Sequence, residues 1–250
     1  MGTIKFSVVT ITYNNRDGLS RTANSIQNQT NKNYEWIIID GASTDGTQDD
    51  FPHYPSATII SEPDNGIYDA MNKGINRATG DYLIFMNAGD MFATPDILDH
   101  VNSLTHPNPD LIYGDSIEGA YYKTARTPQH INWGLFTHHQ AIFYNRQALG
   151  DIRYDTNYKI AADYDLTLRF LQNHKNAMYI RKPICIFEQG GISQQQVKRG
   201  RDEQFISRQK NKSCSTFINY TVKSIQKLAW AIRSHANWIY WSLKNKKQPL

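Results

Sequence analysis

The stretch Glu62-Pro-Asp-Asn-Gly-Ile-Tyr-Asp-Ala-Met-Asn-Lys-Gly-Ile75 joins a predicted strand to a predicted helix, and it decides the fold. Residues 57–61 before it are short, apolar and β-branched, and Pro63 cannot continue the strand that they predict. Apolar residues then recur at steps of four from Ile67 to Ile75, which predicts a helix. The polar residues at this junction lie where α/β proteins bind ligands, although a capped surface turn would use the same residue types.

Three more apolar runs end in polar loops in the same way. They are residues 6–12, 34–40 and 82–86. One helical pattern follows the run at 6–12, and the helix predicted from Ile67 precedes the run at 82–86. Strands that alternate with helices at this spacing predict an α/β fold with a doubly wound, mostly parallel sheet and helices on both faces. The polar loops would then meet along one edge of the sheet.

The composition is that of a soluble globular protein with one substantial core. The chain has 250 residues, of which 40% are hydrophobic and 20% charged. The two cysteines, Cys185 and Cys214, lie far apart and lack the spacing of a metal site, so we expect a reducing compartment and no disulfide scaffold. We expect no signal peptide, and no apolar run reaches the roughly 18 to 20 residues that cross a bilayer.

Charge divides the chain into a slightly acidic body, 1–197, and a basic tail, 198–250. The tail holds 12 of the 27 Lys and Arg residues but 2 of the 23 Asp and Glu residues. A basic amphipathic helix with aromatic residues is typical of a segment that lies on an anionic membrane surface. Packing on the body and formation of a homodimer are the alternatives, and nucleic acid is disfavoured because no recognition fold accompanies the charge. The apolar stripe consists of Ile218, Val222, Ile225, Ala229, Ile232, Ala236, Ile239 and Leu243.

Three motifs in this order resemble family 2 glycosyltransferases of the GT-A fold. They are Val9–Asn15 (VTITYNN), Ile37–Thr47 (IIIDGASTDGT) and Ser61–Gly74 (SEPDNGIYDAMNKG). The third is particularly similar to the branch that assembles bacterial colanic acid, O-antigen and capsule repeat units. The resemblance runs from about Phe6 to about Ser193 and excludes the tail.

The resemblance implies a nucleotide-sugar pocket at the ends of the first strands. Asp40 would contact the base or ribose, because carboxylates accept hydrogen bonds from base N–H groups and ribose hydroxyls. Lys73 would offer a point charge to phosphate. The implied nucleotide-sugar-binding residues are Thr10, Thr12, Tyr13, Asn15, Asp40, Ser43, Asp45, Asp64, Asn65, Asp69, Lys73, Asn87 and Ala88.

The loop after the fourth strand stands where this family has its Asp-x-Asp metal motif. Here it reads Asn87-Ala88-Gly89-Asp90, so Asp90 is the only full anionic ligand and Asn87 a weaker neutral one. A diphosphate leaving group normally requires Mn2+ or Mg2+ to neutralise its oxygens, and the resemblance implies one of these cofactors. A simple Gly-Asp turn is the structural alternative.

The resemblance also implies a general base at the start of a later helix. The family carries Glu-Asp there, and this chain has Ala162-Asp163, so Asp163 aligns with the base and Asp165 is the fallback. A single base suffices for inverting transfer, because it removes the proton of the acceptor hydroxyl as that oxygen attacks the anomeric carbon. Stabilisation of the helix start by a carboxylate is the structural alternative.

The acceptor site is expected around His138 and His139. Adjacent residues on an extended segment face opposite ways, so only one histidine can point into the site, and we choose His139, which could instead be structural. Gln140 and Trp133 complete the predicted acceptor-binding set, with core packing as the alternative for Trp133.

The leading hypothesis is an inverting glycosyltransferase that uses a nucleotide sugar, favoured as UDP-linked, and a lipid-linked saccharide acceptor in bacterial surface polysaccharide synthesis. We expect it in the cytoplasm, peripheral on the inner face of the plasma membrane. A sugar-phosphate nucleotidyltransferase is a second hypothesis, but the loop at 12–18 has too few glycines. A non-catalytic, membrane-docked scaffold with a degenerate pocket is a third, because Asn87 and Ala162 replace expected acids.

Overall fold

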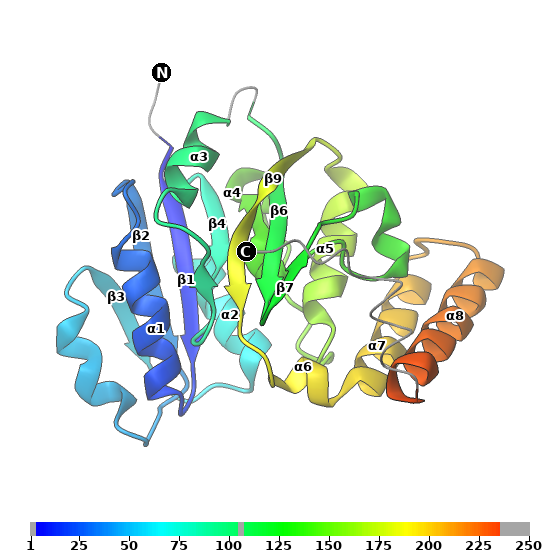
Figure 1. The fold of residues 1–250 in the computed structure, drawn as a ribbon, viewed down its shortest axis with the longest axis horizontal. Coiled ribbons are helices and arrows are strands. Elements are labelled where there is room, and N and C mark those ends of the chain that lie inside the picture. Colours follow the sequence, from blue (N-terminus) through cyan, green and yellow to red (C-terminus); the bar gives the residue numbers. More distant parts are fainter. Residues whose placement is uncertain (1–3, 105–107, 236–250) are drawn as a thin grey trace.

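The computed structural model describes residues 4–104 and 108–235, and its strands form one curved sheet with helices on both faces (Figure 1). The order across the sheet is β3-β2-β1-β4-β8-β6-β9-β5, and β7 pairs with β6. The strands are β1 (Phe6–Thr12), β2 (Tyr34–Asp40), β3 (Ala57–Ser61), β4 (Tyr82–Phe85), β5 (Met91–Phe92), β6 (Leu111–Glu118), β7 (Tyr121–Lys123), β8 (Ile142–Asn145) and β9 (Ala177–Phe187).

Helices and 3-10 turns lie between most consecutive strands, and the last three helices follow β9. The α-helices are α1 (Arg16–Gln27), α2 (Ile67–Arg77), α3 (Ile97–Ser103), α4 (Arg146–Leu149), α5 (Ala162–Asn173), α6 (Ile192–Gln195), α7 (Val197–Lys210) and α8 (Thr216–His235). Short 3-10 turns are η1 (Thr47–His53), η2 (Pro128–Trp133) and η3 (His139–Ala141).

The parallel half of the sheet places the predicted loops at one edge. β1 pairs in parallel with β2 and β4, and β2 pairs in parallel with β3. The register sets Thr12 opposite Asp40, and Asp40 opposite Ser61, so these strands end together. The predicted fold class is confirmed. The second half is more mixed than a purely parallel sheet, because β8 runs antiparallel to both β4 and β6.

Each face of the sheet carries its own core. Val9 and Ile11 of β1 belong to the core that includes residues of α2 and α5, while Phe6 and Val8 belong to the core that includes residues of α1 and α3. Every residue of β1 is buried, as the near-continuous apolar run of a strand covered on both faces requires. This rigid sheet supports the loops at its carboxyl edge.

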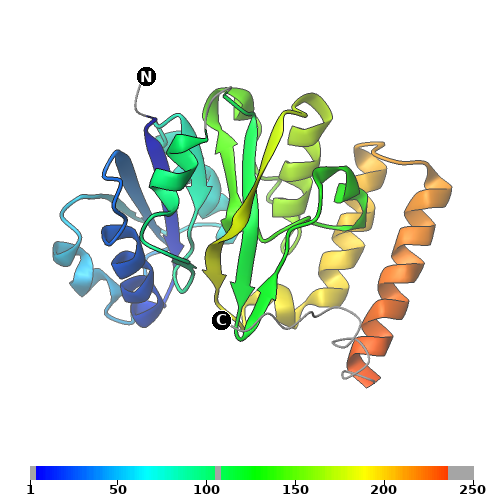
Figure 2. The ribbon, with the colours of Figure 1, turned by 45° about the horizontal axis from the view of Figure 1, so that its top comes forward.

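The tail begins as a helical hairpin, and one side of it packs on the body. Figures 1 and 2 both show α7 and α8 side by side, at the end of the molecule far from β3. Val222 of α8 is completely buried, and the buried Arg208 of α7 donates to Asn219 (Nε–Oδ1 2.6 Å). The boundary predicted at 197/198 falls at the start of α7 and remains a prediction.

The predicted apolar stripe is therefore only partly a packing face. Ile218 and Ile225 are 46% and 45% exposed, in contrast to the buried Val222. The stripe positions Ala236, Ile239 and Leu243 lie outside the described residues, and so does the side chain of Ile232. Within residues 4–104 and 108–235, no helix combines the length and the apolar character that crossing a membrane demands. Both cysteines are free.

Candidate active site

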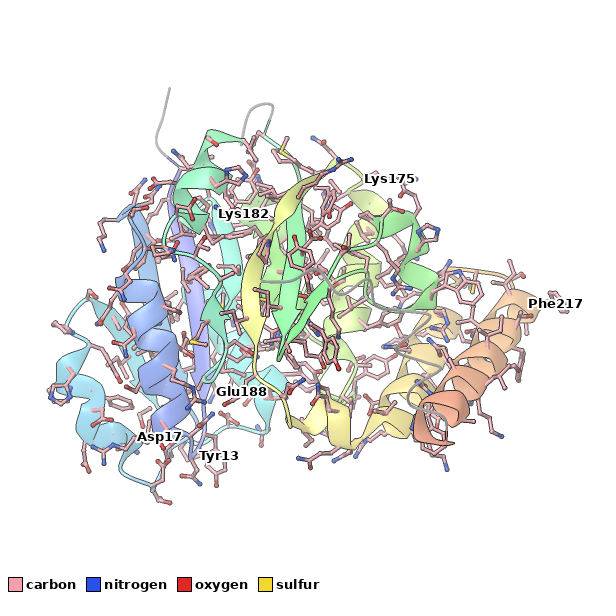
Figure 3. All side chains as sticks on the ribbon, viewed as in Figure 1. Tyr13, Asp17, Lys175, Lys182, Glu188 and Phe217 are labelled. Carbon is pink, nitrogen blue, oxygen red and sulfur yellow. The ribbon has the colours of Figure 1, made fainter. Side chains whose placement is uncertain are left out.

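Polar loops gather at the edge of the sheet where β1, β2, β3 and β9 end. Figure 3 shows Tyr13, Asp17 and Glu188 at this lower edge, and Lys175, just before β9 begins, at the upper edge. Asn15 ties two of the loops together: its Oδ1 accepts from the N–H of Gly18 at the start of α1 (3.1 Å), and its Nδ2 donates to the carbonyl of Ala88 (3.1 Å).

The first-strand residues of the predicted pocket lie at different depths. Tyr13 is 66% exposed at the edge. Thr12 is buried, and its Oγ1 has no hydrogen-bond partner among the described residues. Thr10 is fully buried and accepts a hydrogen bond from the indole of Trp36 (2.9 Å), so the structure does not bring Thr10 to the edge.

Asp40 organises the loop that follows β2. Its carboxylate is fully buried and accepts hydrogen bonds from the hydroxyl of Ser61 (2.6 Å) and from the backbone and hydroxyl of Ser43. Ser43 in turn accepts from the N–H of Asn14 (2.8 Å), which connects this loop to the first. Asp45 accepts from Thr47, and this hydrogen bond lowers the pKa of the Asp45 carboxyl.

Residues 62–75, which follow β3, make most of their polar contacts with one another. Asp64 accepts from the N–H of Gly66 (3.0 Å), and Asp69 accepts from the N–H of Asn65 (2.9 Å). Lys73 pairs with Glu62 (Nζ–Oε1 3.0 Å) and donates to the carbonyl of Pro63 (2.9 Å). Asp64 also reaches the second loop, because a Cβ added at Gly41 would lie 2.9 Å from its Oδ2.

The same stretch also positions helix α5, which carries Asp163, and no pattern in the sequence indicated this role. Tyr68 of α2 donates to the carbonyl of Ile160 (2.7 Å), two residues before α5 begins. Asn72 exchanges hydrogen bonds with the backbone of Tyr154 (2.8 and 2.9 Å). Helix α2 therefore holds the segment that leads to Asp163.

Asn87, His139 and Asp163 form a continuous chain across the site. The amide nitrogen of Asn87 lies 3.2 Å from Nε2 of His139, and Nδ1 of His139 lies 3.4 Å from Oδ2 of Asp163. The imidazole of His139 therefore lies between the side chains of Asn87 and Asp163, with one ring nitrogen toward each. The structure thus brings the predicted metal loop, the predicted acceptor histidine and the predicted base together.

The fallback base has a different environment. The side chain of Asp165 is 2% exposed, and its carboxylate accepts from Arg169 (2.7 Å) and from Ser207 of α7 (2.7 Å). The side chain of Asp163 is 18% exposed and faces His139. Asp165 joins α5 to α7, whereas Asp163 is accessible to a substrate hydroxyl.

Gln140 and Asp90 form a buried pair behind this chain. The amide of Gln140 donates to Oδ2 of Asp90 (2.7 Å), and the backbone N–H of Glu188 donates to Oδ1 (2.9 Å). Burial raises the pKa of Asp90 to about 6, against these hydrogen bonds, which lower it. Gln140, predicted to bind the acceptor, is 2% exposed and contacts Asp90.

Oxygen donors around residues 87–90 suit a hard divalent cation. Oδ1 of Asn87 is buried and has no hydrogen-bond partner among the described residues, and the Asp90 carboxylate has lone pairs beyond the two that its donors occupy. In the described part of the chain, no three His, Cys, Asp or Glu side chains form a self-contained metal cage. Mg2+ in phosphate-binding sites is usually held by one or two carboxylates together with substrate oxygens, so the residues present fit such an ion.

His138, which is outside the predicted acceptor-binding set, and Trp133, which belongs to it, have other partners. His138 stacks on Phe187 (centroids 4.3 Å apart) and bonds to Ser116, and burial lowers the pKa of His138 to about 3. His139–Ala141 is a 3-10 turn, so the expected extended segment is wrong there, although the two histidines do face different ways. Trp133 is 40% exposed in η2, and its carbonyl accepts from Gln226 of α8 (3.2 Å), which places it toward the tail.

Comparison with known proteins decides among the three function hypotheses. The family model described as glycosyl transferase family 2 matches residues 7–187. The chain belongs to this family. It is therefore a glycosyltransferase, and neither the nucleotidyltransferase nor the scaffold hypothesis is retained.

Relatives and solved structures agree with this membership. A PGL/p-HBAD biosynthesis glycosyltransferase from Mycobacterium bovis is 33% identical over 224 residues, covering 81% of this chain and 83% of that protein. Staphylococcus aureus TarS 1-349, in complex with UDP-GlcNAc, superposes with a TM-score of 0.69 at 17% identity and covers 97% of this chain and 76% of its own. The mannosyltransferase PcManGT from Pyrobaculum calidifontis, in complex with GDP-Man and Mn2+, gives 0.66 at 15% identity, covering 97% and 79%. The two structural likenesses show the GT-A fold.

Proposed function

We propose that this glycosyltransferase moves a sugar from a nucleoside-diphosphate donor, UDP-linked, to a hydroxyl of a lipid-linked saccharide, with inversion at the anomeric carbon. The chain of contacts from Asn87 through His139 to Asp163 carries the proposal, because it joins a cation loop to an accessible carboxylate. TarS was solved with UDP-GlcNAc, and PcManGT with GDP-Man and Mn2+, which supports a nucleotide-sugar donor here.

Asp163 performs the chemical step in this proposal. Its carboxylate takes the proton of the acceptor hydroxyl while that oxygen attacks the anomeric carbon from the face opposite the donor diphosphate. The bond from that carbon to the diphosphate oxygen breaks, and the electron pair leaves with the nucleotide. Oδ2 of Asp163 faces Nδ1 of His139 and Oδ1 accepts from the backbone N–H of Tyr164 (2.7 Å), so each carboxylate oxygen keeps a lone pair for the acceptor hydroxyl. Mn2+ or Mg2+, when bound beside Asn87 and Asp90, would neutralise charge on the diphosphate.

A thermal-shift screen tests the donor part of the proposal. The protein is heated with UDP, GDP, dTDP or CMP, each with and without Mn2+. A ligand that binds only the folded state raises the midpoint in proportion to the logarithm of its concentration over Kd. We expect the largest rise with UDP and Mn2+ together. A larger rise with GDP would reassign the donor, and no rise with any nucleotide would contradict the proposal.

The nucleotide pocket is tested through Asp40. Because its buried carboxylate holds Ser43 and Ser61, Asp40→Ala removes the charged hydrogen bonds that support the loop proposed to hold the nucleotide. We expect nucleotide affinity to weaken by about 1.5–3 kcal/mol, the range for hydrogen bonds to charged groups. Calorimetry with UDP measures it, and Asp49→Ala, an exposed carboxylate of η1, is the control. Equal affinity of the two variants would remove Asp40 from the site.

We further propose that α8 holds the enzyme on the anionic inner face of the bacterial plasma membrane, next to its lipid-linked acceptor. Several large apolar side chains of this helix are exposed although one side is packed. Phe217 is 81% exposed and Leu228 61%. The tail's Lys and Arg residues supply the attraction to anionic lipid.

Substitutions on the exposed side test membrane binding without removing the packed side. Truncation would also remove Asn219, the partner of the buried Arg208. The double variant Phe217→Glu/Leu228→Glu is compared with Thr221→Glu/Ser224→Glu, which adds the same charge at exposed polar positions. We expect the first to bind anionic liposomes at least about tenfold more weakly than the second, because it loses two apolar side chains. Equal co-sedimentation would contradict membrane binding through this side, and a change of oligomeric state would favour dimerisation.

A further inference from the structure

Glu188 stands immediately after β9, at the same sheet edge as the loop 87–90. Figure 3 shows it at the lower edge of the molecule, near Tyr13 and Asp17. Its backbone N–H donates to Oδ1 of Asp90 (2.9 Å), so the main chain at 188 is fixed against the predicted cation ligand. Its side chain is 39% exposed and therefore open to a ligand at the edge.

The carboxylate of Glu188 fills the space that a side chain at position 89 would use. Gly89 has φ +105°, and a Cβ added there would overlap the Glu188 carboxylate, with Oε2 as the nearest atom. The loop therefore carries no side chain at 89, and a carboxylate reaches the same place from β9. The orphaned Oδ1 of Asn87 belongs to the same loop.

Asp90 alone is poorly placed to face a substrate diphosphate. It is 4% exposed, and each carboxylate oxygen already accepts a hydrogen bond, one from Gln140 and one from the backbone of Glu188. Divalent cations in phosphate sites are held by one or two carboxylates plus phosphate oxygens. A second, accessible carboxylate beside Asp90 completes such a set.

We propose that Glu188 is the second carboxylate ligand of the cation that binds at residues 87–90, and that its carboxylate takes the place of an acidic side chain that Gly89 does not supply. This inference rests on the proposed use of a divalent cation. In the structure Oε1 of Glu188 pairs with Arg21 of α1, while Oε2 lies over Gly89. Arg21 and the proposed cation would therefore bind the same carboxylate. The proposal does not require Arg21 to hold the Glu188 side chain in place.

Mn2+ binding tests the proposal directly. The electron paramagnetic resonance signal of free Mn2+ is titrated with the full-length protein in the presence of UDP. We expect Glu188→Gln to raise the Kd for Mn2+ at least about tenfold, since loss of even an outer partner of a metal site typically costs 10–100-fold. Glu188→Asp, which keeps the charge on a shorter side chain, should retain part of the affinity.

Two control variants test whether Glu188 binds the cation itself or acts only through its ion pair with Arg21. Asp96→Asn removes a carboxylate that pairs with Lys182 of β9 in the same type of surface bridge (2.5 Å), and we expect its Kd to stay within about twofold of wild type. Arg21→Met breaks the bridge from α1 but leaves the carboxylate, so Mn2+ affinity should be unchanged or tighter. If Arg21→Met weakens Mn2+ binding as much as Glu188→Gln does, Glu188 acts through the bridge and the proposal fails.

The experiment also distinguishes this inference from the proposed function. Wild-type protein that binds Mn2+ with UDP, together with a Glu188→Gln variant of equal affinity, would overturn the role of Glu188 alone. Wild-type protein that binds UDP but no Mn2+ would overturn both the cation and this ligand, while the glycosyltransferase assignment would stand.

Discussion

We expect Asp163→Asn to lower the rate of sugar transfer by at least about a hundredfold, with nucleotide affinity near that of wild type. A general base contributes typically 10²–10⁴-fold, because it acts only where the acceptor hydroxyl loses its proton. The asparagine keeps the shape and the contact with His139 but cannot take that proton. Transfer is measured under saturating donor and acceptor, and UDP affinity by calorimetry, so that a loss confined to kcat identifies the chemical step.

Asp165→Asn is the matched control for this result. It makes the same chemical change two residues along α5, but at a buried carboxylate that pairs with Arg169 and Ser207. We expect a lower Tm, with loss of about 1–3 kcal/mol of stability from weakened charged hydrogen bonds, and a much milder effect on kcat of the folded enzyme. An active Asp163→Asn enzyme beside an inactive Asp165→Asn enzyme would show that the base has been placed two residues too early.

The parallel half of the site was predictable because its signals are local. A β-branched run followed by a polar loop marks the end of a buried strand, and parallel strands end at one edge. This reasoning placed Asp40, Ser61 and Asn87 at the carboxyl ends of neighbouring strands. Thr10 shows its limit: in a strand covered on both faces, every side chain is buried before the loop begins, and Thr10 faces Trp36.

The other half of the site depends on pairings that no local pattern contains. Gln140 meets Asp90 across 50 positions, and Glu188 meets Asp90 across 98. Both contacts require β8 to insert antiparallel beside β4 and β9 to cross to β6. Glu188 directly follows a strand, and that signal could have indicated it as a site residue. The Glu188 carboxylate, however, lies over Gly89, where there is no side chain. Sequence periodicity does not indicate such a space.

The tail shows a related limit, because helical periodicity identifies an apolar stripe but not what covers it. Val222 and Ile225 occupy the same predicted stripe, yet one is buried and the other 45% exposed. Contacts with α7 and η2 set which side of α8 is covered, and the buried Arg208 of α7 bonds to Asn219 of α8. A side chain outside the stripe, Phe217, is the more exposed apolar group. For this reason the membrane test uses exposed positions and not the stripe as a whole.

Removal of divalent cation is expected to have an effect as large as removal of the base. A cation that neutralises a leaving diphosphate is worth several kcal/mol of transition-state stabilisation, which corresponds to roughly a thousandfold in rate. We therefore expect EDTA to abolish transfer and added Mn2+ or Mg2+ to restore it. The measurement is the rate of UDP release with acceptor present, after dialysis against the chelator and then with each cation added back.

Asp90→Asn separates the protein's part in this effect from the cation's general attraction to diphosphate. The amide oxygen can still accept from the backbone N–H of Glu188, and its NH2 group can donate to Oε1 of a flipped Gln140, which has no partner among the described residues, so the buried site keeps much of its geometry while losing its charge. The variant should need at least about tenfold more Mn2+ for half-maximal rate, by comparison with the 10–100-fold cost of disturbing a metal's outer partners. Full activity of the wild-type enzyme in EDTA would mean that a protein cation performs this role. Arg21, beside Glu188, and Lys73, beside Glu62, would then be the side chains to replace next.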